Sequence, residues 1–353
     1  MNYVFFHYPC NDGLMAAVAA YQALGTTAIY YGVDYNVEEK VVKQAICGNN
    51  FDETETSVLV TDKFRKIYFV DYCPSVSMLK WFYENDLLSN VVVIDHHATG
   101  FEHISDFFIE MVKAGKFSEH DAVPFDTYMS YDKSGALLTY DYFVNENMIV
   151  NEDIRKYFYW ASIRDLFLDT ADGISYEDKV VSNAFTSYVV DLRNKFVQNK
   201  QERLTQDEFC LALIQYVDSE IKNSTDETLL PYVEKVKDYE NMCRMINKTA
   251  FYPQHNPEYV FVNCMHSHAS TACYFLYMES DRPYAIAYQV GYRNGVYGLT
   301  LNFRCRKQNS IVELAKKYGG GGHKCAAGAF IPADREDFLD VVKEVLEGTM
   351  RMT

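Results

Sequence analysis

The chain has 353 residues, of which 48% are hydrophobic and 23% charged, a composition typical of a globular protein long enough for two domains. Its formal net charge of −16 argues against a protein that coats long duplex nucleic acid, because such proteins neutralise phosphates with Lys and Arg. The nine cysteines are scattered and include no Cys-x-x-Cys pair, which fits a reducing compartment. The N-terminus does not resemble a leader, and no apolar run approaches the roughly 18 residues of a membrane span. We therefore expect a cytoplasmic protein that does not bind membranes.

The N-terminal region predicts a strand, a turn and a helix. Apolar residues 3–6 suit the strand, Pro9 and Gly13 suit the turn, and residues 14–24 have a helical composition. The same turn carries His7 and Asp12, which we therefore place at the carboxyl end of the first strand. A second strand is predicted over 27–33 and a short helix over 38–46.

Two later strands end on residues that commonly bind metals. Asp71 follows the predicted strand 66–70, and Asp95, His96 and His97 come at the end of the β-branched run 91–94. Such a run is typical of a strand buried on both faces of a parallel sheet. Because open α/β sheets bind ligands at the carboxyl ends of their strands, the pattern predicts an α/β domain with a doubly wound, mainly parallel sheet and a site at that edge.

Three strand ends that carry only Asp and His indicate a divalent cation. Carboxylate oxygen and imidazole nitrogen together suit Mn²⁺, and Mg²⁺ or Co²⁺ less specifically. The simpler interpretation is that these side chains cap helices and lie on the surface. Asp165, in a helix predicted over 153–167, is a further candidate, although its neighbour Arg164 is also typical of a buried salt bridge.

Beyond this region the chain predicts a helical segment and then a second domain. Helical, charged sequence with breaks near Thr205 and Ser224 runs from about 190 to 247. We therefore expect a metal-binding domain over 1–190, a helical linker over 191–255 and a smaller α/β domain over 256–353. In the last domain we predict strands over 259–264, 283–291, 296–305 and 326–331, and helices over 270–278, 311–318 and 335–347.

Two features of the last domain indicate phosphate binding. Arg304, Arg306 and Lys307 place three cations in four positions at the end of a strand. Shortly afterwards four consecutive glycines precede a histidine, and such glycines let backbone N–H groups converge on an anion. A flexible joint is the alternative interpretation of the glycines. The candidate substrate-binding residues are Arg304, Gly320, Gly321, Gly322 and His323.

These motifs, in this order, resemble the DHH/DHHA1 phosphoesterase superfamily, which includes RecJ exonucleases, nanoRNases that are also pAp phosphatases, and cyclic-dinucleotide phosphodiesterases. The resemblance covers nearly the whole chain and rests on His7…Asp12-Gly13, Asp71, Asp95-His96-His97, Ser134-Gly135, Asp165 and Gly319-Gly320-Gly321-Gly322-His323…Ala326-Ala327-Gly328.

The resemblance implies two bound Mn²⁺ and a substrate-binding domain across a cleft from the catalytic one. It implies that Asp71 bridges both metals, that Asp12 and His96 complete one site, and that His7 and Asp165 belong to the other. His97 would face the scissile phosphate. The residues that would hold the rest of the nucleotide are Arg304, the glycine run and His323.

The first motif departs from the family pattern, because Cys10 stands where the first of two Asp residues is expected. Thiolate is a soft ligand, better matched to zinc than to manganese. The sequence therefore leaves open whether Cys10 is a ligand, and whether one metal site is looser, differently filled or empty.

We therefore expect a metal-dependent phosphoesterase that hydrolyses phosphodiester or phosphomonoester bonds of small nucleotides. Its partners would be short single-stranded oligonucleotides, pAp or cyclic dinucleotides, and not long duplex nucleic acid. One alternative is a protein that binds or sequesters a nucleotide messenger through a degenerate metal site. A polyphosphatase or pyrophosphatase is less favoured, because the GGGGH-type domain accompanies nucleotide substrates in this family. The oligomeric state, a homodimer included, stays open.

Overall fold

The computed structural model describes residues 1–34, 38–47, 66–149, 151–166, 174–199, 204–293, 295–306 and 309–350. Within these ranges the chain forms two compact units, the first ending at Val233 and the second beginning at Glu234. That boundary falls inside one helix, α9 (Asp226–Asn247). Each unit has its own sheet and its own buried core.

The first unit is built on a five-stranded sheet whose neighbouring strands are all parallel, in the order β2-β1-β3-β4-β5. This confirms the mainly parallel α/β sheet expected from the sequence. The strands are β1 (Asn2–His7), β2 (Ala28–Val33), β3 (Ile67–Val70), β4 (Val91–Asp95) and β5 (Asp126–Met129). Every residue of β3 and β4 is buried, as expected for apolar runs in the middle of a parallel sheet.

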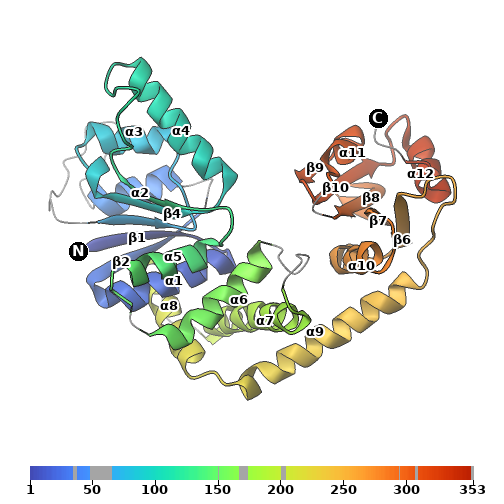
Figure 1. Ribbon diagram of the computed structural model, residues 1–353, viewed down its shortest axis with the longest axis horizontal. Helices are drawn as coiled ribbons and strands as arrows, with labels where there is room; N and C mark the ends of the chain where they lie inside the picture. Colours follow the sequence, from blue (N-terminus) through green and yellow to red (C-terminus); the bar gives the residue numbers. More distant parts are fainter. Residues whose placement is uncertain are drawn as a thin grey trace. The chain divides into compact units, whose positions relative to one another are not determined.

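Helices cover both faces of this sheet (Figure 1). Because side chains alternate along a strand, Val4 and Phe6 of β1 contribute to one core, while Tyr3 and Phe5 contribute to the other. The first core is completed by α1 (Asn11–Leu24), α5 (Gly135–Asn145), α6 (Arg155–Asp165), α7 (Tyr176–Asn199) and α8 (Gln206–Lys222). The second is completed by α2 (Glu38–Cys47), α3 (Val76–Glu84) and α4 (Ala98–Lys113).

The strand order creates a topological switch point between β1 and β3. From β1 the chain first adds β2 on one side, and the later strands are added on the other side. At such a point the connections leave in opposite directions, which opens a crevice at the carboxyl ends of the strands. His7 ends β1 and Asp71 directly follows β3, so both predicted ligands lie at this point.

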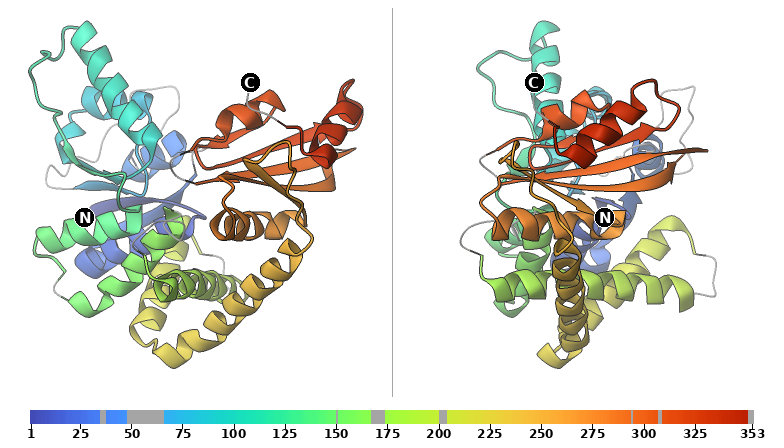
Figure 2. Two further views of the ribbon diagram at one scale, coloured as in Figure 1. Left: turned by 45° about the vertical axis from the view of Figure 1, so that its right-hand side comes forward. Right: turned by 90° about the vertical axis from the view of Figure 1, so that its right-hand side faces the viewer.

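The second unit contains a mixed five-stranded sheet in the order β6-β7-β8-β10-β9 (Figure 2). Only β6 and β7 are parallel. The strands are β6 (Tyr259–Asn263), β7 (Tyr284–Arg293), β8 (Val296–Cys305), β9 (Gly321–His323) and β10 (Ala326–Pro332). One face packs against α10 (His266–Glu279) and the C-terminal part of α9, and the other against α11 (Val312–Lys317) and α12 (Phe338–Glu347).

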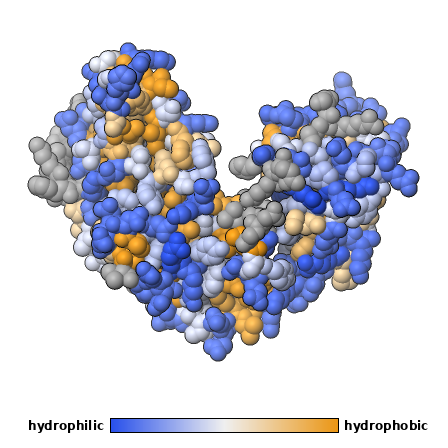
Figure 3. All heavy atoms as spheres, in the orientation of Figure 1, coloured by the Kyte–Doolittle hydropathy of each residue, from blue (hydrophilic) through white to orange (hydrophobic). Residues whose placement is uncertain are grey.

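Short 3-10 turns complete the described elements: η1 (Gly25–Thr27), η3 (Leu88–Asn90) and η4 (Glu152–Ile154). On the face drawn in Figure 3, hydrophilic residues cover most of the second unit, while several apolar patches interrupt the surface of the first. Among the described helices, none combines the length and apolar character needed to cross a lipid bilayer.

Candidate metal centre

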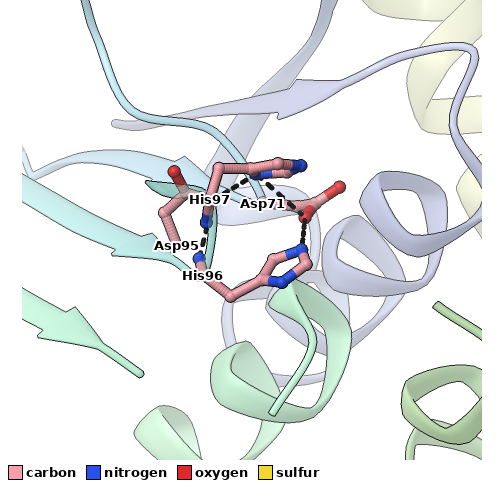
Figure 4. A group of neighbouring side chains, drawn as sticks. All are labelled: Asp71, Asp95, His96 and His97. Atoms are coloured by element: carbon pink, nitrogen blue, oxygen red, sulfur yellow. Dashed lines mark hydrogen bonds and ion pairs between the residues drawn. The ribbon is translucent and has the colours of Figure 1, made fainter. Parts of the chain in front are cut away.

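Side chains from neighbouring strands converge at the carboxyl edge of the first sheet (Figure 4). Nε2 of His96, which follows β4, lies 3.2 Å from Oδ1 of Asp71, which follows β3. Nδ1 of His97 lies 4.0 Å from the same oxygen. On the other side of Asp71, its Oδ2 lies 3.7 Å from Nδ1 of His7 at the end of β1. The parallel sheet thus brings together residues that are far apart in the sequence.

The described residues contain three groups of possible metal ligands, one of which joins Asp71 to Asp95, His96 and His97. The other two groups lie on either side of Asp71. Its carboxylate joins His7 and Cys10 in one set, and the second set contains Asp12, His96 and Asp165; within each set the ligand atoms lie within 4.8 Å of one another. Asp165 Oδ2 is 3.3 Å and Asp12 Oδ2 is 3.8 Å from Nε2 of His96. Asp71 thus turns Oδ1 towards His96 and Oδ2 towards His7.

The grouping differs in one respect from the arrangement that the family resemblance implies. Asp165 lies beside His96 and Asp12, whereas the resemblance implies that it shares a site with His7. The third member of the His7 set is Cys10. Asp165 comes from the end of α6 and Cys10 from the N-cap of α1, so the helices bring both residues to the strand ends.

The polar atoms at the centre fit a bound cation. Oδ1 of Asp12, both carboxylate oxygens of Asp71 and Nε2 of His96 are buried, and they make no hydrogen bond in the part of the chain that the structure describes. A buried carboxylate without a donor is destabilising, typically by several kcal/mol. A divalent cation would supply the missing partner for each oxygen, and oxygen ligands with imidazole are the set that Mn²⁺ accepts.

The pKa values agree with a site that is incomplete without a cation. Burial, followed by the charge of Asp71, raises the pKa of Asp12 well above its ordinary value. Burial also raises the pKa of Asp71, which the charge of His97 opposes. Burial lowers the pKa of His7, which keeps its imidazole neutral. Metal ligands must be deprotonated, so a cation bound here would displace protons from the carboxyl groups.

Cys10 differs from the other ligand-type residues in its protonation. Burial, together with the charges of Asp71 and Asp12, raises the pKa of the Cys10 thiol to about 12. The thiol is therefore protonated at neutral pH unless a metal ion displaces its proton.

Glycines let two helices approach the carboxylates closely. A Cβ atom on Gly135, at the start of α5, would overlap the side chain of Asp71, and one on Gly13 in α1 would overlap the carbonyl of His7. The backbone N–H of Ala136 donates to Oδ2 of Asp12 at 3.2 Å, so the positive end of α5 faces a carboxylate. Asp71 has a φ of 54°, which is uncommon for a residue with a side chain and is concentrated at functional sites.

Asp95 has a different role from its neighbours. Its Oδ1 accepts hydrogen bonds from the backbone N–H of His96 at 2.8 Å and from Nδ1 of His97 at 2.7 Å. These bonds fix the orientation of the His97 ring. Burial alone would lower the pKa of His97, but the hydrogen bond and charge of Asp95 outweigh it and the pKa is raised. From the sequence, Asp95 was a candidate ligand, and nothing in its position after a strand distinguishes a ligand from an orienting residue.

The candidate phosphate-binding residues of the second unit already hold its fold together. Nη1 of Arg304 donates to the carbonyl of Phe303 at 2.8 Å, and its Nε donates to Oγ of Ser270 at 3.3 Å. The N–H groups of Gly319 and Gly320 donate to carbonyls at the end of α11, each at 2.9 Å. The next residues form β9, with Gly321 and Gly322 paired to β10. Lys307 and the side chain of His323 lie outside the described part of the chain.

No family model matches the chain, and no curated protein matches its sequence. Among solved structures, a pGpG-specific phosphodiesterase from Vibrio cholerae is similar over 99% of both chains, with a TM-score of 0.50 and 15% identity. An exopolyphosphatase-related protein from Bacteroides fragilis covers 99% of this chain and 92% of its own, with a TM-score of 0.42 and 10% identity. The chain therefore has a fold that is also found in a phosphodiesterase.

Proposed function

We propose that this protein is a metal-dependent phosphoesterase of the DHH/DHHA1 type that hydrolyses phosphate esters of small nucleotides, with Mn²⁺ as its metal. The observation that carries the proposal is the position of Asp71, whose two oxygens face two sets of carboxylate, imidazole and thiol groups at the switch point of the sheet. The fold shared with a dinucleotide phosphodiesterase supports it.

In this proposal the chain's own residues have distinct tasks. His7, Asp12, Asp71, His96 and Asp165 would hold the metal, which when bound would polarise the phosphoryl group and lower the pKa of water. His97, held by Asp95 and with a raised pKa, would donate a hydrogen bond to a phosphoryl oxygen and stabilise the charge that develops there. Asp95 would act only through His97, as a positioning residue.

We propose a small nucleotide as substrate for two reasons. The net charge of −16 disfavours a long polyanion, so a substrate has to be recognised locally. The Vibrio cholerae protein with the same fold acts on pGpG, a dinucleotide. Residues of the second unit would bind the remainder of the nucleotide: Arg304, Gly320, Gly321, Gly322 and His323.

The test is turnover of defined nucleotides. Purified protein would be incubated with MnCl₂ and, separately, with pGpG, pAp and a cyclic dinucleotide, and the products separated by ion-exchange chromatography. We expect turnover of at least one, its loss with EDTA, and its recovery with added Mn²⁺. Failure to cleave any phosphodiester or phosphomonoester of this set would contradict the proposal.

A second function is nucleotide binding without cleavage, and the single observation that favours it is the thiol of Cys10 in the metal centre. A protonated thiol occupies the place in the His7 set where a carboxylate would neutralise and hold a hard cation. Calorimetry separates the two functions, because a sequestering protein would bind pGpG with measurable heat and return it intact after incubation with Mn²⁺.

A further inference from the structure

Beside the candidate metal centre, the first unit contains a pocket of about 300 Å³ between α1, α6 and α7. Asp12 and Asp165 form part of its wall, so the pocket lies directly beside the proposed metal ligands. Cys10, a candidate ligand of the His7 set, also lines the pocket, whereas the rest of its lining has no task in the proposed function. That lining includes the apolar side chains of Met15, Phe185 and Val189, and the polar side chains of Asn11, Arg164 and Thr186.

We propose that this pocket binds the nucleobase next to the scissile phosphate. The inference rests on the proposed function, because it assigns part of the same substrate. The volume lies at the lower end of the roughly 300–1,000 Å³ typical of small-molecule sites, which are also mostly apolar with a few polar groups. A nucleobase has the matching character, with apolar faces and hydrogen-bonding edges.

The lining favours a base over a second phosphate. Met15, Phe185 and Val189 would each lie against the ligand, and burying a hydrated anion among such side chains is unfavourable. Arg164 adds a positive charge to the wall, and its planar guanidinium can donate hydrogen bonds to the edge of a base. For a base, the same apolar side chains gain by removing its faces from water.

Two features hold the pocket in shape. The Phe185 ring packs against Tyr157 and Trp160, with ring centroids 5.4 Å and 6.0 Å away. Nη1 of Arg193 donates to the carbonyl of Pro9 at 2.5 Å and to Oδ1 of Asn11 at 3.4 Å, which orients the Asn11 amide at the pocket wall. Preformed walls lose little side-chain entropy when a ligand enters.

The position of Trp160 provides a test that does not depend on catalysis. The chain has two tryptophans, Trp81 and Trp160, and a Trp81→Phe variant leaves Trp160, beside Phe185, as the reporter. We would titrate this variant with guanosine 5′-monophosphate and with ribose 5-phosphate, which has the sugar and phosphate but no base, in buffer containing MnCl₂. We expect a saturable change in Trp160 fluorescence with the nucleotide, and binding of ribose 5-phosphate at least about tenfold weaker.

A filled pocket should remove this preference. In the same Trp81→Phe background, Thr186→Phe would place a ring in the pocket, and Ser187→Phe, at the next and exposed position of α7, is the matched control. We expect Thr186→Phe to weaken nucleotide binding at least about tenfold while ribose 5-phosphate binds as before, and Ser187→Phe to change neither.

The outcomes also separate this inference from the proposed function. Equal affinity for the two ligands in the Trp81→Phe protein would overturn the nucleobase assignment even if pGpG is hydrolysed, and so would unchanged nucleotide binding in Thr186→Phe. Conversely, a base-dependent signal without turnover of any nucleotide would support the pocket and contradict the phosphoesterase.

Discussion

The two units use their polar strand-end residues in opposite ways. In the first unit, Oδ1 of Asp12 and both carboxylate oxygens of Asp71 are buried without a hydrogen bond among the described residues, so the fold tolerates them at a cost in stability. In the second unit, the Arg304 guanidinium and the backbone N–H groups of Gly319 and Gly320 donate hydrogen bonds to neighbouring carbonyls. Polar groups that the fold leaves unsatisfied indicate a ligand, whereas satisfied ones are explained by the fold itself. The two sets should therefore respond differently to mutation.

The largest effect is expected for Asp71→Asn. Asparagine has nearly the same shape and tolerates a positive φ, but its neutral amide would not bridge two ligand sets. Losing several kcal/mol of charge stabilisation corresponds to at least about a 10³-fold fall in kcat. Because a buried carboxylate without a hydrogen bond is removed, the thermal midpoint of the metal-free protein should rise. A variant that loses stability as well as activity would contradict our view of Asp71.

Asp95→Asn should have the next largest effect on catalysis. The amide oxygen can still accept from the backbone N–H of His96, but the charge that holds the His97 ring and raises its pKa is lost. Residues that orient an active group in this way typically contribute about 10–100-fold. We expect kcat to fall by this factor, measured with pGpG, while Mn²⁺ affinity by calorimetry changes little. A loss of Mn²⁺ binding equal to that of Asp71→Asn would mean that Asp95 is itself a ligand.

The sequence predicts the buried parts of the fold well because their patterns are unambiguous. The run 91–94 is apolar at every position, and β4 (Val91–Asp95) consists of this run and the Asp that comes next. β5 (Asp126–Met129) was not predicted, because it is a short, partly exposed edge strand with no apolar alternation. The helix α4 was not predicted either. In the second unit β8 begins and ends where we expected, whereas α10 starts four residues earlier, at His266.

The sequence predicted which ligand-type residues lie close together, but not how they are grouped. Strand-end position identifies His7, Asp71 and His96, because parallel strands present their carboxyl ends at one edge. It does not determine which helix end approaches which strand, so the place of Asp165 beside His96 required the structure. The glycine run shows the opposite difficulty. Its sequence is as compatible with an anion-binding loop as with a strand, but Gly321 and Gly322 form a strand paired to β10.

Glycine substitutions in the second unit sharpen the comparison. A Cβ atom on Gly320 would overlap the carbonyl of Gly328 and lie 2.7 Å from Cβ of Ala329, whereas one on Gly321 would meet nothing within 4 Å. Gly320→Ala should therefore lower the free energy of unfolding of the second unit by about 1–3 kcal/mol, and Gly321→Ala by less than about 0.5 kcal/mol. Chemical denaturation with a near-ultraviolet probe measures both.

Gly321→Ala also tests whether this backbone contacts a phosphate. If it does, the added methyl group should raise the KM for pGpG without changing stability. If KM and stability are both unchanged, the glycines serve only the fold. The second unit would then contrast fully with the first, whose unsatisfied polar groups indicate a ligand. Equal destabilisation by both substitutions would instead mean that the close packing around Gly320 is not what requires glycine.

The smallest effect concerns Cys10, the one soft ligand among hard ones. Cys10→Asp would add an oxygen ligand to His7 and Asp71, and we expect Mn²⁺ affinity to rise by about tenfold at the expense of the preference for Zn²⁺, measured by competition calorimetry. Cys10→Ser is the matched control, since it removes the thiol without adding a charge. The aspartate would also add a carboxylate beside Asp12, Asp71 and Asp165, so the metal-free variant should unfold more readily than the parent protein. If Cys10→Asp raises the Mn²⁺ affinity and lowers the stability of the metal-free protein, Cys10 is the residue that limits the negative charge of this centre. If the parent and both variants bind Mn²⁺ with the same affinity, Cys10 does not contact the metal.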